Sequence, residues 1–538
     1  MYKWIGWVSL GLAVAGCGSD KVDSAEAGEA AEDSGAGSTD GDSAAPDDSA
    51  ADSGTSDFVV SLDGMTAHLN ALNEIANDNG GNRAAGTAGY AASAAYVQAQ
   101  LEAAGYSVEV HEFDITTEEW GSPPGVEVST GTILDLEVDF VPFSYTGAGV
   151  ITAPVTSVDL SLPPGDEDNS STSGCESADF SGFSVGNIAL IQRGTCSFQD
   201  KASNAVAAGA SGVLIFNEGQ PGRTELFAGT LDAGTDNPVP VFALTFDAGA
   251  NLATMAETDT VTISADLSFV AVPTMNVFAE TPGDADRAVV IGAHMDSVLA
   301  GPGINDNGSG VAMILEMALQ IARDDVSPDN QLRFMFWGGE ELGLLGSLDY
   351  VLGLSEEEHG RILANLNFDM VASPNPTRMV YDGSGSLGGG AGPDGSIQIE
   401  QLFSGWFDAQ GMAYAETPFD GRSDYGPFIW TGIPAGGLFT GAEQPKSTHE
   451  AETFGGTPGE AYDPCYHQAC DSIDNLDWGV LDEMAAAAAH VVLQLGSWDG
   501  PLSDGLGGAP ASHSEQNRRL KTDRLPTGCG GSPQLWRR

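Results

Sequence analysis

Three apolar runs in the second half of the chain each lead into a histidine or a carboxylate. They are Ala288–Ala293 before His294, Leu332–Trp337 before Glu340 and Glu341, and Ile362–Phe368 before Asp369. Short apolar runs that alternate with helical segments predict a largely parallel sheet. We therefore expect an α/β fold with a mixed, mostly parallel sheet and helices on both of its faces. In such folds, ligands bind beyond the carboxyl ends of the strands, where these side chains stand.

Two further residues of the same chemical types lie outside these strand ends. Asp306 stands in the loop 303–310 before a helix, and His467 lies between Cys465 and Cys470. Each is weak evidence alone, because an Asp often caps a helix and a loop His is often merely exposed. Their occurrence together with the strand-end residues favours zinc, since imidazole and carboxylate ligands suit this ion and leave a position open for water.

Long stretches around these residues carry a family resemblance. They are 292–310, 337–347 and 454–471. Through them, segments 64–118 and 268–498 resemble the M28 family of zinc aminopeptidases, in particular its Streptomyces-type and aminopeptidase Y-like members. The resemblance implies the zinc exopeptidase fold and a hydrolase that removes N-terminal residues.

The resemblance implies a metal centre with two Zn²⁺ ions per chain. His294 and Asp369 would bind one ion, Glu341 and His467 would bind the other, and Asp306 would bridge the two. Two ions roughly 3.5–4 Å apart can lower the pKa of water toward 7.

The resemblance also implies roles for the residues beside the ions. Asp296 would orient His294, Glu340 would be the general base, and Tyr466 would hydrogen-bond the tetrahedral oxyanion. Arg422 would lie near the backbone carboxylate side of the substrate. A structural salt bridge is the alternative role for Arg422.

Two positions depart from the family pattern. The sequence Ser423-Asp424-Tyr425 stands where the family often has Ser-Asp-His, so contacts around the ligands are expected to differ there. Ala486 replaces the second Asp of the calcium site that some secreted relatives have, so we expect no calcium ion.

Residues 120–267 differ in character from the segments on either side. Short apolar runs separated by Gly and Pro turns predict mostly strands, and the stretch Asn187–Phe198 resembles a protease-associated (PA) domain. We therefore expect a catalytic domain formed by 58–119 and 268–498, interrupted by a mainly β PA domain at 120–267. This segment has no cluster of His and carboxylates, so we expect a lid, a spacer or a substrate-selecting element.

The cysteines of the body fall into two pairs. We predict disulfides Cys175–Cys196 and Cys465–Cys470, which fit an exported protein. Zinc is the alternative for clustered cysteines, and it is disfavoured because no C-x-x-C pair is present. Cys529, in the tail, has no assigned role.

The N-terminus has the pattern of an export signal. Lys3 precedes the apolar run Ile5–Ala15, which is the length of a signal-peptide core and too short for a bilayer span. Cys17 stands where a bacterial lipobox needs it, so we expect residues 1–17 to be a lipoprotein signal peptide with Cys17 lipidated. Ordinary cleavage after Ala15 is the alternative. We expect export, lipid anchoring at the bacterial cell envelope or surface with or without later release, and no other membrane contact.

The chain is strongly acidic, with 77 Asp and Glu against 19 Lys and Arg and a formal charge of −58. This charge repels phosphate backbones, which excludes nucleic acid as a partner, and it attracts metal ions and cationic substrates. Part of it belongs to the linker 18–57, which we predict to be disordered, like the tail 499–538. The rest belongs to the folded body, for which a salty habitat is one hypothesis.

These features together predict a zinc-dependent aminopeptidase that acts as a monomer. Its substrates would be peptides or proteins with free N-termini, from which it releases neutral or large apolar residues. A carboxypeptidase or glutaminyl cyclase of the same superfamily is the enzymatic alternative, but relatives with acidic substrates need several arginines near the metals. A catalytically inactive binding module is the third hypothesis, and it predicts broken ligands, whereas all five ligands and Glu340 are present.

Overall fold

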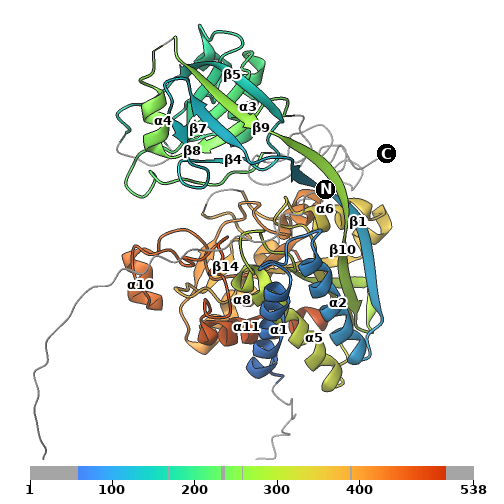
Figure 1. Ribbon diagram of the computed structural model, residues 1–538. Helices are drawn as coiled ribbons and strands as arrows, with labels where there is room; N and C mark the ends of the chain where they lie inside the picture. The colour runs from blue at the N-terminus through green and yellow to red at the C-terminus, as the bar shows by residue number, and fades with distance from the viewer. Residues whose placement is uncertain (1–57, 166–169, 232–236, 257, 388–389, 504–538) are drawn as a thin grey trace, which may run out of the picture. The chain divides into compact units, whose positions relative to one another are not determined.

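The computed structural model describes residues 58–165, 170–231, 237–256, 258–387 and 390–503 (Figure 1). Some expectations concern residues outside these ranges. They are the signal peptide 1–17 with Cys17, the linker 18–57, and the tail beyond residue 503 with Cys529. Within the described ranges, no helix has both the length and the apolar character needed to cross a membrane.

The first of two sheets is built mainly from the second half of the chain. Its eight strands, in spatial order, are β1 (Val108–Trp120), β10 (Leu267–Glu280), β12 (Asn330–Trp337), β11 (Asp284–His294), β13 (Ile362–Phe368), β16 (Ala435–Phe439), β14 (Met379–Tyr381) and β15 (Ala415–Thr417). The central strands β12, β11, β13 and β16 run parallel to one another, and antiparallel pairs join β1, β10 and β12 on one side and β16 and β14 on the other. The expectation of a mixed, mostly parallel sheet is confirmed.

Side chains of β11 alternate between the two faces of this sheet. Val289 and Ile291 belong to one core cluster, whereas Val290 belongs to a separate cluster with Trp337. Because β11 is apolar at every one of these positions, both faces must be covered by other elements. This explains why the sheet has helices on both sides.

Five long helices contribute to the first cluster, and two shorter ones contribute to the second. The long helices are α1 (Leu62–Asp78), α2 (Ala88–Ala103), α5 (Gly310–Arg323), α8 (Ser396–Gln410) and α11 (Trp478–Gly496). The shorter ones are α6 (Leu345–Gly353) and α9 (Tyr425–Thr431), and α7 (Glu356–Gly360) and α10 (Thr448–Phe454) are additional short helices. Helices α1, α2 and α5 lie side by side, so the N-terminal segment packs on the helix that follows Asp306 (Figure 1).

A second eight-stranded sheet is formed by residues between β1 and β10. Its strands, in spatial order, are β3 (Ile133–Leu134), β2 (Gly125–Val128), β9 (Thr260–Ala265), β5 (Gly149–Val158), β6 (Ile188–Gln192), β7 (Gly212–Phe216), β8 (Val241–Leu244) and β4 (Phe140–Pro142). The short helices η1 (Ser177–Phe180), α3 (Phe198–Ala207) and α4 (Phe246–Leu252) accompany it. β1 pairs with β10 along its whole length, so the strands that lead to and from the inserted sheet are bonded to each other.

Both expected disulfides are present in the structure. The Cys175–Cys196 bond lies in the inserted segment, and the Cys465–Cys470 bond closes the short loop that carries Tyr466 and His467. The second disulfide therefore restricts the loop from which one candidate metal ligand projects.

Candidate metal centre

The candidate ligands come together because three neighbouring strands end at one edge of the sheet. His294 is the last residue of β11, Glu341 follows β12, and Asp369 follows β13. β11 pairs in parallel with both of the other strands, so their carboxyl ends coincide. Asp306 comes from the irregular turn Ile304–Ser309 that precedes α5.

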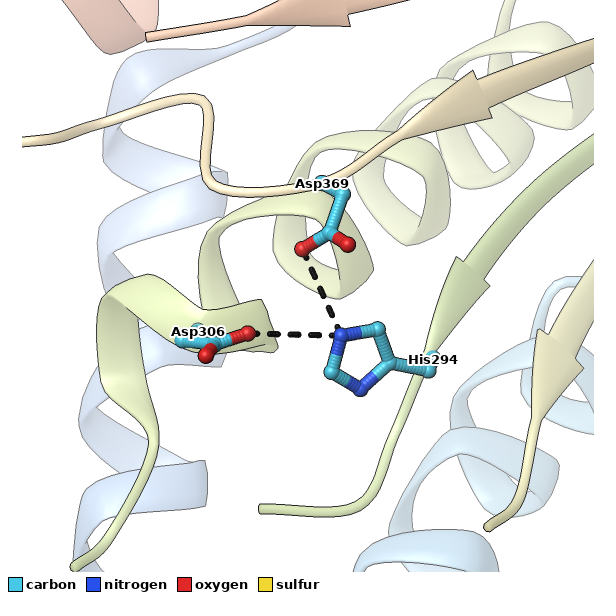
Figure 2. Close-up of side chains that lie close together, drawn as sticks. All are labelled: His294, Asp306 and Asp369. Carbon is cyan, nitrogen blue, oxygen red and sulfur yellow. Dashed lines mark ion pairs between the residues drawn. The ribbon is translucent and has the colours of Figure 1, made fainter. Parts of the chain in front are cut away.

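Asp306 lies between two groups of ligands. Its Oδ1 is 3.3 Å from Nε2 of His294, and its Oδ2 is 3.3 Å from Nε2 of His467. Nε2 of His294 is also 3.3 Å from Oδ1 of Asp369, and Nε2 of His467 is 2.9 Å from Oε2 of Glu341. Figure 2 shows Asp306 and Asp369 directed at the same ring nitrogen of His294. Each group of three offers ligand atoms within 4.8 Å of one another, and Asp306 belongs to both groups.

The residues fit a metal ion by the chemistry of their atoms. Among the described residues, Nε2 of His294, Oε1 of Glu341 and Oδ1 of Asp369 are buried and make no hydrogen bond. Leaving a buried polar atom unpaired costs roughly 1–3 kcal/mol, so cations bound to these atoms would remove that cost. Two imidazoles with three carboxylates are a donor set that zinc accepts.

The carboxylates surround the two histidines with negative charge. Burial alone would lower the pKa of His294, but Asp369 and Glu340 raise it well above the ordinary value. Burial would likewise lower the pKa of His467, and the carboxylate of Glu341 raises it. A metal ion must displace protons from such imidazoles, so its binding weakens as the pH falls.

Asp296 connects the loop of His294 with the loop of the two glutamates. Nδ1 of His294 is 3.1 Å from the backbone carbonyl of Asp296 and 3.6 Å from its carboxylate. Both atoms are acceptors, which favours the proton on Nδ1 and leaves Nε2 free for a metal. The same carboxylate accepts the backbone N–H groups of Glu340 at 3.2 Å and Glu341 at 3.3 Å. Asp296 therefore contacts the second loop as well as the histidine.

The adjacent glutamates have different surroundings. Oε2 of Glu341 points to His467, whereas Oε2 of Glu340 is 3.9 Å from Nε2 of His294. Burial raises the pKa of Glu340 well above its ordinary value, His294 lowers it, and the carboxylates of Glu341 and Asp369 raise it further. A carboxyl group with a raised pKa accepts a proton more readily than an ordinary glutamate does.

Tyr466 and Arg422 form a contact at the more exposed side of the centre. The guanidinium of Arg422 donates from Nη2 to the Tyr466 hydroxyl at 3.1 Å and from Nη1 to Glu443 at 3.0 Å. The Tyr466 ring stacks on the His467 ring with centroids 3.8 Å apart. The structure thus shows the salt bridge named as the alternative role of Arg422, together with a bond that links Arg422 to Tyr466.

Three residues that contact the candidate ligands or their loops were not assigned a supporting role from the sequence. Ser423 donates to Oδ2 of Asp369 at 2.6 Å, although the sequence marked Ser423 only as part of a departing motif. Asp471 accepts the N–H of Asp306 at 3.0 Å, and burial raises its pKa to about 8. Arg83, the third, lies far from these residues in sequence. Ser423 and Asp471 stand in stretches quoted from the sequence above, but neither residue type nor spacing assigned them a role there, and Arg83 lies outside those stretches.

Family models match both parts of the chain. The model of peptidase family M28 matches residues 276–492, and the model of the PA domain matches residues 151–252. An aminopeptidase of Pseudomonas aeruginosa is 44% identical over 461 residues, which cover 85% of this chain and 84% of that protein. The chain belongs to peptidase family M28. The family and the PA insertion that the sequence indicated are therefore confirmed.

Two further similarities extend this M28 assignment. A probable lipoprotein aminopeptidase of Mycobacterium tuberculosis is 40% identical over 443 residues, which cover 80% of this chain and 84% of that protein. The solved structure of a zinc aminopeptidase from Bacillus subtilis matches with a TM-score of 0.61 at 25% identity, covering 83% of this chain and 98% of that one.

Proposed function

We propose that this M28 chain uses two zinc ions to hydrolyse the N-terminal peptide bond of peptides and proteins, releasing neutral or large apolar residues. That the chain is a zinc-dependent aminopeptidase rests on its family and on relatives that bear this name. The number of ions rests on one observation, which is that the two carboxylate oxygens of Asp306 face different ligand groups. His294 and Asp369 would hold one ion, and Glu341 and His467 the other.

Glu340 would be the general base of the reaction. When bound, the ions would lower the pKa of the attacking water and polarise the scissile carbonyl. Glu340 would take the proton of that water and return it to the leaving amine. Its position supports this role, because Oε2 of Glu340 lies 3.9 Å from Nε2 of His294.

Tyr466 would bind the oxyanion of the substrate, and nearby carboxylates would bind its free amine. Because Arg422 donates to the Tyr466 oxygen, the phenol proton remains available for the oxyanion of the tetrahedral intermediate. Asp369 and Glu340 would attract the free amine of the substrate. Arg422 would bind on the far side of the scissile bond, in exchange for part of its pairing with Glu443.

The alternatives explain fewer of these features. A carboxypeptidase or glutaminyl cyclase with acidic substrates would need several arginines whose guanidinium groups can reach the substrate. Arg422, beside Tyr466, is one arginine that could do so, which falls short of several. Arg83 could not, because it is fully buried and bonded to backbone carbonyls and so offers nothing to a substrate. A binding module without activity does not require the placement of Glu340 beside His294.

We also propose a cellular location for the protein and boundaries for its domains. The name of the mycobacterial relative supports export and lipid anchoring through Cys17. Residues 58–119 and 268–498 would form the catalytic domain of a monomer, with the PA domain at 120–267.

A panel of anilide substrates tests the proposed specificity. We expect leucyl- and phenylalanyl-anilides to be cleaved fastest and aspartyl-anilide slowest. The N-acetylated leucyl-anilide should lose at least roughly 10³-fold in kcat/KM, because a buried site that binds a free amine rejects a substrate without one. A zinc chelator should abolish all cleavage, and added zinc should restore it. Comparable cleavage of the acetylated substrate would exclude an aminopeptidase.

A further inference from the structure

Arg83 is a fully buried arginine behind the metal centre. It lies in the turn between α1 and α2, about 210 residues before the first ligand, and its side chain is 0% exposed. A buried guanidinium is costly unless its donors are paired. The hydrogen-bond acceptors of Arg83 therefore indicate its role.

The guanidinium of Arg83 binds backbone carbonyls from two ligand loops. It donates to the carbonyl of Met295, which lies between His294 and Asp296. It also donates to the carbonyls of Gly303 and, at 2.9 Å, Pro302, in the turn that leads to Asp306.

The backbone of Arg83 adds a further link to the first ligand loop. Its N–H donates to Oγ of Ser297 at 2.9 Å, and its carbonyl accepts the N–H of Ser297 at 3.4 Å. One residue from the turn between α1 and α2 is thus bonded to both loops of the candidate metal centre.

The turn that carries Asp306 is also bonded to Asp471. This carboxylate accepts the N–H of Asn305 at 2.8 Å and the N–H of Asp306 at 3.0 Å. In the same turn, Gly303 has a positive φ of 62°, and a Cβ there would lie 2.4 Å from the carbonyl oxygen of Asp306, so the turn requires glycine at this position. The turn that carries Asp306 is therefore bonded to Arg83 at its start and to Asp471 at Asn305 and Asp306.

Arg83 also contributes a fixed positive charge. Burial lowers its pKa to about 10, against the opposing effect of Asp296, Asp471, Asp306 and Glu341. It therefore stays protonated at neutral pH, and it offsets part of the repulsion among these carboxylates without occupying a ligand position.

We propose that Arg83 is a positioning residue of the metal centre, which holds the His294 and Asp306 loops at the separation that zinc requires and balances the charge of the carboxylates behind them. This inference rests on the metal centre of the proposed function. Residues that orient metal ligands through hydrogen bonds typically contribute 10–100-fold to metal affinity, which sets the expected size of the effect.

Three variants test this role: Arg83→Gln, Arg83→Lys and the control Arg287→Gln. Arg287 is a matched control because it also donates to backbone carbonyls, those of Trp498 at 2.8 Å and Gly500 at 2.7 Å, from the opposite end of β11. The first readout is the rate at which zinc passes to a chromogenic chelator. The second is kcat and KM at saturating zinc. Thermal melting of the zinc-free proteins measures the purely structural effect.

We expect Arg83→Gln to release zinc roughly 10–100-fold faster than the wild type, with kcat lowered and KM nearly unchanged. Arg83→Lys keeps the charge but not the forked geometry of the guanidinium, so its zinc release rate should lie between those of the wild type and Arg83→Gln. Arg287→Gln should release zinc at the wild-type rate, even where it lowers the melting temperature.

Zinc release from Arg83→Gln at the wild-type rate would overturn the proposal, as would equal acceleration in Arg287→Gln at a similar loss of stability. If Arg83→Gln does not fold, Arg83→Lys decides, and a wild-type release rate in that variant rejects the role. A wild-type protein that holds no zinc would overturn the metal centre and this inference together. Normal zinc binding by the wild type with unaltered variants overturns the inference alone.

Discussion

Replacing Glu340 by glutamine is expected to lower kcat by roughly 10²–10⁴-fold while the zinc content stays near that of the wild type. Glutamine keeps the size of the side chain and removes the base. Glu340 is not a member of either ligand group, so the ions should remain bound. KM should change little, because the proton is transferred only during the reaction. Steady-state kinetics combined with metal analysis measure both effects.

The neighbouring Glu341→Gln variant is the matched control for this experiment. The chemical change is the same and the position differs by one residue, but Glu341 belongs to the ligand group of Asp306 and His467. We expect this variant to lose zinc, and to recover part of its activity when zinc is added in excess. If Glu340→Gln retained activity within about tenfold of the wild type, the assignment of the general base would be wrong.

Replacing Asp306 by alanine is expected to have the largest effect on metal content. Its two oxygens face His294 and His467, so the change removes a ligand from both groups at once. We expect less than one zinc per chain and no detectable hydrolysis. Loss of Asp369 should instead affect mainly the group of His294.

Asp382→Ala separates loss of a ligand from loss of a buried aspartate. Asp382 is 1% exposed and accepts hydrogen bonds from the hydroxyl of Ser384 and the N–H of Leu387, but it belongs to neither ligand group. This control should lose stability and keep its zinc. An Asp306→Ala protein that retained two ions would show that the bridging assignment is wrong.

The apolar strands explain why much of the fold could be predicted from the sequence. The central strands β11, β12 and β13 contain the three runs that were identified, and α5 is the helix that was expected after the loop 303–310. Because parallel strands end together, the residues that follow them had to lie near one another. Local sequence patterns thus indicated both the core and most of the candidate ligands.

Strand β16 was not predicted because its sequence opposes strand formation. It contains Gly436 and Gly437, and glycine has low strand propensity. The structure requires glycine at 437, where φ is 151° and a Cβ would lie 1.9 Å from the carbonyl oxygen of Asn367 in β13. Tertiary contact outweighs local preference at this position.

The supporting residues were missed for a related reason. Arg83 bonds to backbone carbonyls more than 200 residues away in sequence. Every residue has a backbone carbonyl, so the residue type does not show which one accepts a hydrogen bond. Ser423 and Asp471 likewise act through contacts that the fold creates. Candidate ligands at strand ends, and an orienting residue as near in sequence as Asp296, can therefore be predicted from sequence, whereas supporting bonds from distant residues such as Arg83 require the structure.

Anomalous diffraction at the zinc absorption edge, from crystals of the wild-type protein, tests the central claim most directly. The two-ion centre predicts two peaks per chain. One should contact His294 and Asp369, the other Glu341 and His467, and Asp306 should contact both. A single peak, or ions held by other residues, would contradict the two-ion centre.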